Sequence, residues 1–217
     1  ELARMPQLSA VILADNALPN LDGLASTGYL HLLDVSGNQL GSLGALGGVT
    51  GLTVLRAARN LLTDVAGLEA QGALVELDLS DNQLTSVAAL PPLPALTRLS
   101  LAGNSLEDVG VLATATSLVD VDLSDNLVTD VTALGNAPPL QYLDLHSNRI
   151  TSIDGLANLT ALYRLDLGEN ELTSLDAAAT LSGLVELDVS SNRVTDLAPL
   201  AALPYLQRVS LGGNQVT

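Results

Sequence analysis

The stretch Leu118-Val119-Asp120-Val121-Asp122-Leu123-Ser124-Asp125-Asn126 has the form Leu-x-x-Leu-x-Leu-x-x-Asn, with Val121 at one of the Leu positions. The same pattern returns every 22 residues with no insertion or deletion, and it ends at ten asparagines: Asn16, Asn38, Asn60, Asn82, Asn104, Asn126, Asn148, Asn170, Asn192 and Asn214. A fixed period of this length is the sequence signature of a solenoid, in which each unit stacks on its neighbours. We therefore expect an elongated molecule built from repeated units.

Two apolar columns precede each asparagine, and in the opening stretch they are Val121 and Leu123. Alternation over so short a run predicts a strand with one buried face, and stacked strands predict a parallel sheet. The segment that returns to the next strand has only about a dozen residues, which predicts a turn or two of 3₁₀ or α-helix on the convex side. Pairs such as Thr129-Asp130 and Thr151-Ser152 precede this segment. Their Asp or Ser side chains are expected to cap its N–H groups.

These features occur together in residues 140–159 (LQYLDLHSNRITSIDGLANL) and 195–203 (TDLAPLAAL). The pattern resembles the 22-residue class of leucine-rich repeats found in phosphatase-regulator-like proteins and in internalin-like bacterial surface proteins. The resemblance covers essentially the whole chain. It implies an α/β fold: a right-handed leucine-rich-repeat solenoid with a parallel concave β-sheet and short 3₁₀ or α segments on the convex side. Because this repeat class serves many unrelated partners, the resemblance specifies the fold more closely than the function.

A few positions depart from the repeat. They are Ala57 in a strand column, Ala178 in the convex Leu column, and Thr27 and Gln71 in the apolar column that follows. We expect a locally thinner core at each of them.

The domain prediction is one leucine-rich-repeat domain over residues 1–217, with nine full repeats and the strand of a tenth. Terminal repeats of a solenoid normally carry an atypical cap, because an open end exposes the stacked core. Since neither end departs from the internal pattern, we expect the sequence to be an excerpt of a longer chain. The family resemblance favours a bacterial cell-surface or secreted protein, with a cytoplasmic scaffold as the alternative.

The chain is strongly acidic, with 24 acidic residues, eight basic residues and a net charge of -16. Such a surface repels phosphate backbones and anionic lipids, so the expected partner is a protein with a basic surface rather than nucleic acid or a membrane. There is no cysteine to supply a disulfide or a thiol nucleophile, and the two histidines, His31 and His146, stand several repeats apart. The sequence also lacks a phosphate-binding loop, a dinucleotide fingerprint and a His-Glu-x-x-His motif. We expect a non-enzymatic protein with no cofactor.

The repeated asparagines are expected to be structural rather than ligand-binding. An asparagine amide both donates and accepts hydrogen bonds, so a buried ladder of them can satisfy backbone groups that the turns leave unpaired. The predicted ladder comprises Asn38, Asn60, Asn82, Asn104, Asn126, Asn148, Asn170 and Asn192.

Acidic residues concentrate at the positions expected to face away from the core, six, four, two and one residues before each asparagine. These 40 positions hold 13 acids and five arginines. The clearest feature is the column Asp122, Asp144, Asp166 and Asp188, preceded by Asp78 and interrupted at Ser100. Neighbouring strands lie about 4.8 Å apart, so these carboxylates repel one another. Three interpretations stay open: a docking strip for a basic partner, carboxylates that are solvated or bonded to nearby backbone, and calcium bridging.

Tyr142 is the aromatic residue expected on the concave face, beside Asp120, Asp144 and Arg164, with His146 two residues beyond Asp144 along the same strand. Tyrosine and arginine are frequent interface anchors, so this cluster is the predicted hot spot. The alternatives are a solvated His146, rim packing for the other tyrosines (Tyr29, Tyr163 and Tyr205), and arginines (Arg98, Arg164 and Arg208) that only neutralise adjacent acids. The predicted function is protein recognition on an acidic concave face, and the alternative is an architectural spacer between flanking domains.

Overall fold

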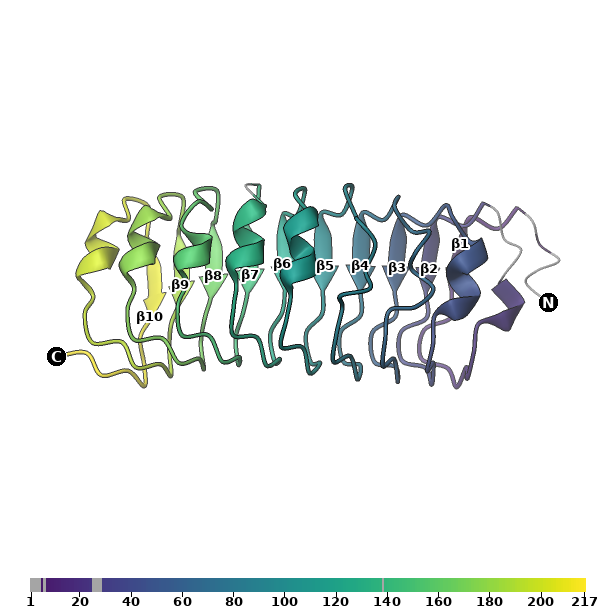
Figure 1. The fold of residues 1–217 in the computed structure, drawn as a ribbon, viewed down its shortest axis with the longest axis horizontal. Coiled ribbons are helices and arrows are strands. Elements are labelled where there is room, and N and C mark those ends of the chain that lie inside the picture. The colour runs from purple at the N-terminus through teal and green to yellow at the C-terminus, as the bar shows by residue number, and fades with distance from the viewer. Residues whose placement is uncertain (1–4, 6, 25–28, 138) are drawn as a thin grey trace.

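The computed structural model describes residues 5, 7–24, 29–137 and 139–217 and winds them into an elongated solenoid (Figure 1). Ten short strands form one parallel sheet in chain order, so each strand pairs with the strands of the repeats before and after it. The strands are β1 (Ala10–Ile12), β2 (Leu32–Asp34), β3 (Val54–Arg56), β4 (Glu76–Asp78), β5 (Arg98–Ser100), β6 (Asp120–Asp122), β7 (Tyr142–Asp144), β8 (Arg164–Asp166), β9 (Glu186–Asp188) and β10 (Arg208–Ser210).

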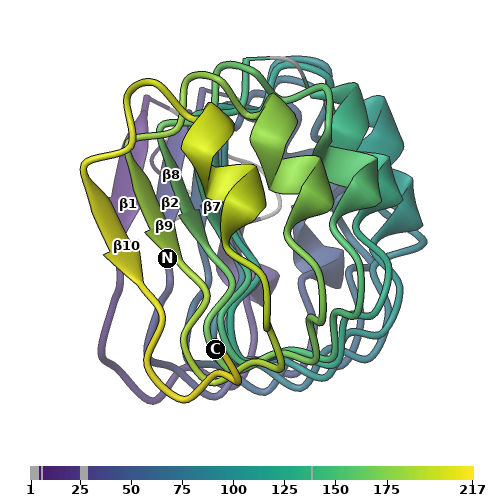
Figure 2. The ribbon, with the colours of Figure 1, turned by 90° about the vertical axis from the view of Figure 1, so that its left-hand side faces the viewer.

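The opposite side of the solenoid carries short 3₁₀ helices, as the end-on view shows (Figure 2). They are η2 (Asp22–Leu24), η3 (Gly44–Gly48), η4 (Gly110–Thr114), η5 (Thr132–Asn136), η6 (Asp154–Leu156), η7 (Asp176–Thr180) and η8 (Ala198–Ala202). The segments between β3 and β5 return through turns without such a helix. The predicted fold class, a parallel concave sheet with short convex segments, is confirmed.

The helices begin where the sequence predicts a cap. Asp130 Oδ1 accepts a hydrogen bond from the N–H of Thr132 at 2.8 Å, and Ser152 Oγ accepts one from the N–H of Asp154 at 3.1 Å. Each bond satisfies the first N–H group of a helix that has no partner inside the helix.

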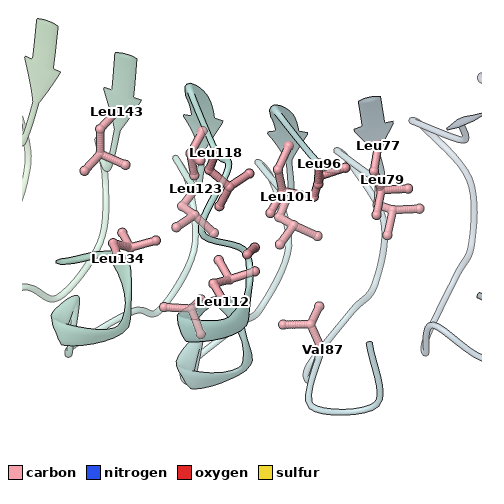
Figure 3. Packing of buried hydrophobic residues seen from close by; sticks show 14 of the residues in the cluster. Leu77, Leu79, Val87, Leu96, Leu101, Leu112, Leu118, Leu123, Leu134 and Leu143 are labelled. Atoms are coloured by element: carbon pink, nitrogen blue, oxygen red, sulfur yellow. The ribbon is translucent and has the colours of Figure 1, made fainter. Parts of the chain in front are cut away.

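The hydrophobic core runs the length of the solenoid between the sheet and the convex segments. In β6 and β7 the middle residues, Val121 and Leu143, are 1% exposed, while their neighbours along each strand face outward. Leucines from successive repeats stack in continuous columns, so each repeat completes the core of the next (Figure 3). This is why the apolar columns of the sequence keep a strict 22-residue period.

Every strand is followed by a sharp turn just before the repeated asparagine. The residue at that point has a positive φ in all ten repeats, for example φ 53° at Asp125 and φ 66° at Gly37. At Gly37 an added Cβ would meet Oδ1 of the exposed Asp15 side chain, which would have to move aside. The left-handed residue ends the strand and directs the chain into the core.

The asparagines form a ladder that links each repeat to the one before it. Nδ2 of Asn126 donates to the carbonyls of Leu101, Leu123 and Ser124 at 2.9, 3.2 and 3.0 Å, and its Oδ1 accepts from the N–H of Leu106 at 3.0 Å. Equivalent amide contacts occur at Asn38, Asn60, Asn82, Asn104, Asn148, Asn170 and Asn192. Each amide therefore satisfies backbone groups in two successive repeats.

The expectation of a thinner apolar core at Gln71 is wrong, because Gln71 is a buried polar bridge. Its side chain is fully buried, and Nε2 donates to the carbonyls of Leu46 and Val49, while Oε1 has no partner among the described residues. Ala57 and Ala178 are fully buried within the core. Thr27 lies outside the described residues.

Candidate functional site

The concave face is lined by the first and third residues of each strand. In β7 these are Tyr142 and Asp144, on either side of the buried Leu143. Only two of the four outward positions per repeat lie on a strand, because the strands end four residues before the asparagine. The two later columns lie in the turn instead. On the strands themselves, the concave positions hold nine acids and four arginines, so the face keeps its negative excess.

The aspartate column is tied to the turn that follows each strand. Oδ1 of Asp122 accepts from the N–H and the hydroxyl of Ser124 at 3.0 and 2.7 Å, and Oδ1 of Asp144 accepts from the N–H of His146 at 3.0 Å. Equivalent bonds occur at Asp34, Asp78, Asp166 and Asp188. One carboxylate oxygen thus closes the turn, while Oδ2 of Asp122 and of Asp144 has no hydrogen-bond partner in the described part of the chain.

The register brings Asp122, Asp144, Asp166 and Asp188 into one row across four adjacent strands. Desolvation by burial raises the pKa of Asp144, and the neighbouring carboxylates of Asp166 and Asp122 raise it further. A nearby positive charge would therefore stabilise the ionised form of Asp144.

Asp188, at the end of the row, behaves differently. Burial alone favours its neutral form, but hydrogen bonds from the hydroxyl and N–H of Ser190 and from the hydroxyl of Ser210 outweigh that effect and lower its pKa. Its charge is already stabilised by hydroxyl and N–H groups of its own repeat and the next, so a partner has less to add there.

The concave arginines pair with acids of this chain. Arg56 contacts Oε1 of Glu76 at 2.6 Å, Arg98 lies 3.9 Å from Oε2 of the same residue, and Arg164 lies 3.7 Å from Oδ2 of Asp166. Arg208 pairs with Glu186 at 2.5 Å. By contrast, Asp120, Asp122 and Asp144 make no ion pair within 4 Å among the described residues.

A shallow depression of about 330 Å³ lies over β6 and β7, where those three carboxylates meet. Tyr142 and Arg164 also line it, and the register places Asp120, Tyr142 and Arg164 side by side on adjacent strands. Two further depressions, of about 270 and 110 Å³, lie over β4–β6 and β8–β10. All three open onto the same concave face.

Tyr142, which lines the depression, also pairs with a second aromatic ring, that of Tyr163. Tyr163 lies just before β8, and its ring centroid is 5.9 Å from that of Tyr142, with the planes inclined by 54°. The two rings are 42% and 44% exposed. The fixed 22-residue period could have predicted this pair, because it places residue 163 just before the strand that lies beside Tyr142.

His146 was expected along the same strand as Tyr142, and this is wrong, since β7 ends at Asp144 and His146 lies in the turn. There Nδ1 is 3.7 Å from Oδ1 of Asp166 and Nε2 is 3.9 Å from Oε1 of Glu169. Within the described ranges, no group of three or more His, Cys, Asp or Glu side chains is arranged to hold a metal ion. The calcium interpretation of the aspartate row therefore gains no support.

Comparison with protein families gives matches along most of the sheet. Leucine rich repeat models match residues 116–172 and 138–194, a two-copy model matches 72–114, and a further model matches 29–47. A solved internalin C2 from Listeria monocytogenes is 36% identical with a TM-score of 0.72, and the match covers 81% of this chain and 76% of that one. The chain is a leucine-rich repeat protein.

Other leucine-rich repeat structures extend the match over the whole length. The functional domain of InlJ from Listeria monocytogenes is 28% identical with a TM-score of 0.86, covering 100% of this chain and 47% of that one. The ectodomain of the Arabidopsis thaliana receptor kinase GASSHO1/SCHENGEN3 is 26% identical with a TM-score of 0.83, covering 99% of this chain and 28% of that one. The leucine-rich repeat chain thus spans less than half of either structure. No curated protein sequence matches it.

Proposed function

We propose that this chain is a non-enzymatic protein-recognition module whose acidic concave face binds a basic segment of a partner protein. The observation that carries the proposal is the depression over β6 and β7, where Asp120, Asp122 and Asp144 meet without an ion pair within 4 Å among the described residues. An arginine or lysine side chain of the partner enters this depression. The unbroken ten-stranded sheet supports treating residues 1–217 as one such module.

The chemistry of the depression favours a cation on a side chain. A guanidinium can donate two parallel N–H bonds to carboxylate oxygens, and charge-assisted bonds of this kind are stronger than neutral ones. Tyr142 adds an aromatic face within the same depression, and a cation over an aromatic ring is attracted by its quadrupole. Burial, and then repulsion from Asp166 and Asp122, raises the pKa of Asp144, and a bound cation relieves the repulsion. These three contributions act together only between β6 and β7.

The comparisons support recognition as the broader function, since leucine-rich repeat domains are typical protein–protein interaction modules and solenoids offer extended concave binding surfaces. The similar plant receptor ectodomain is in complex with CASPARIAN STRIP INTEGRITY FACTOR 2. The similarity to internalins supports a bacterial surface or secreted location. In the described part of the chain, no helix has the length and apolar character needed to cross a membrane.

The test is affinity capture from extracts of the source cells and of host or neighbouring material. The site variant combines Asp120→Asn, Asp122→Asn and Tyr142→Ala. The control variant combines Asp64→Asn, Asp176→Asn and Tyr205→Ala. Like the site variant, it removes two negative charges and one exposed ring, but at positions outside the strands. Circular dichroism checks that all three proteins fold.

We expect a protein captured by the parent and the control to be lost by the site variant, and its capture to weaken as salt is raised. Capture of the same proteins by the parent and both variants, at every salt concentration, would show that the acids only solvate the surface. The captured proteins would then bind outside the depression, and the proposal would be wrong.

A further inference from the structure

The first three strands carry a different concave surface from the rest. Their outward positions hold Ala10, Ile12, Leu32 and Val54, whereas the fourteen corresponding positions of β4 to β10 hold no aliphatic residue. Ile12 is 70% exposed, and Leu32 and Val54 are half-buried. All four lie outside the hydrophobic core and do not pack against it. They form an aliphatic patch on the concave side of β1–β3. Packing of the solenoid interior does not account for these side chains.

The patch adjoins the acidic surface along one continuous sheet. Arg56 and Glu76 pair at 2.6 Å where β3 meets β4, and this ion pair marks the boundary between the two surfaces. Aliphatic side chains gain stability when a partner removes them from water, and carboxylates gain when a cation approaches. One face therefore offers two kinds of contact in a fixed order along the solenoid.

The spacing of the strands sets the distance between these contacts. Leu32 on β2 and Asp120 on β6 are four strands apart, which corresponds to about 19 Å at the usual strand separation. An extended chain advances about 3.3 Å per residue, so about six residues of a partner cover this distance.

We propose that the concave face binds an extended segment of a partner protein that lies across the strands. Its aliphatic side chains contact the patch on β1–β3, and its arginine or lysine side chains, about six residues away, enter the depression over β6 and β7. The basic half of this motif rests on the proposed function, and the aliphatic half is independent of it. A second copy of this chain is disfavoured as the occupant, because two chains of net charge -16 repel each other.

The test uses a phage-displayed library of random 16-residue peptides selected on the full chain. Representative peptides are then synthesised, and their affinities are measured by fluorescence anisotropy. The patch variant combines Ile12→Thr and Val54→Thr, which keeps β-branched side chains on the strands. The control variant combines Leu61→Thr and Val216→Thr, two aliphatic side chains that are 47% and 42% exposed outside the strands. Sedimentation measures the oligomeric state of each protein.

We expect selected peptides to combine an aliphatic cluster with Arg or Lys about six residues away. The patch variant should bind them about tenfold more weakly, as expected for losing well-packed interface side chains, and the control should bind like the parent. Peptides that carry only basic residues and bind the patch variant equally well would overturn the inference and leave the proposed function standing. Peptides without basic residues, or no enrichment at all, would overturn both. A dimer of the parent that the patch variant loses would make a second copy the occupant.

Discussion

At the scale of single residues, Asn126 shows why the repeat keeps its asparagine. Its amide makes four hydrogen bonds, to Leu101, Leu123, Ser124 and Leu106, and it is 5% exposed. Asn126→Ala should lower the free energy of unfolding by about 1–3 kcal/mol, because buried backbone groups lose their partners. Asn16, which is exposed and bonds only the carbonyls of Leu13 and Ala14, is the matched control. Urea denaturation measures both variants, and equal losses would contradict a role specific to the buried ladder.

Two aspartates of the same row should respond to pH with opposite signs. The pKa of Asp144 is raised above 3.8, so its ionised form destabilises the fold as pH rises through the folded pKa, and this penalty is absent below 3.8. The pKa of Asp188 is lowered, so it stabilises the fold above 3.8, and this contribution is lost as pH falls through its folded pKa. At pH 7, Asp144→Asn should therefore raise the urea midpoint and Asp188→Asn should lower it.

Both asparagine variants keep an Oδ1 that can accept the bond from the turn, so the comparison isolates the charge. The difference between their midpoints should shrink as pH falls below 3.8 and through the lowered folded pKa of Asp188, where both parent carboxyls are protonated. Midpoints that shift in the same direction at pH 7 would contradict this account of the row.

At the scale of elements, the convex helices depend on their caps more than on length, since η5 has only five residues. Hydrogen bonds from the hydroxyl and N–H of Thr132 lower the pKa of Asp130, so its carboxylate is a charged cap at neutral pH. Asp130→Ala should destabilise the protein by about 0.5–1 kcal/mol, as for other exposed caps. Asp130→Ser should retain most of that stability, because Ser152 and Ser174 cap the next two helices in the same way. Urea denaturation at pH 7 measures the pair, and equal destabilisation by Ala and Ser would exclude the capping role.

The elements also show what the sequence could and could not predict. The constant period fixes the register, so the placement of Tyr142 between Asp120 and Arg164 follows from counting residues. The length of the strands does not follow from alternation, because the left-handed residue and the aspartate bonded to the turn decide where pairing ends. Arg56 and Arg98 both pair with Glu76. This pairing depends on side-chain rotamers, which cannot be predicted from the repeat pattern.

Gln71 gave the opposite outcome to the one expected. The repeat pattern marks its position as apolar, and its two backbone acceptors, Leu46 and Val49, become apparent only when the neighbouring repeat is in place. The aliphatic patch on β1–β3 occupies the same repeat positions as the concave acids. The fixed register therefore places both on the same face, and the sequence could have predicted the patch.

At the scale of the whole molecule, repulsion among 24 acidic residues competes with a few exposed ion pairs. Surface pairs such as Arg208–Glu186 contribute about 0–1 kcal/mol each, whereas repulsion acts over the Debye length, about 30 Å at 0.01 M salt and 8 Å at 0.15 M. Raising NaCl from about 10 to 200 mM at pH 7 should therefore raise the urea midpoint while it weakens binding of a basic partner. At pH 4.1, the pI of the sequence, the net charge is close to zero and the stabilisation by salt should largely disappear. If the urea midpoint instead falls as salt is raised at pH 7, the arginine ion pairs outweigh the repulsion. The acid excess on the concave face would then cause no destabilisation that a partner could relieve.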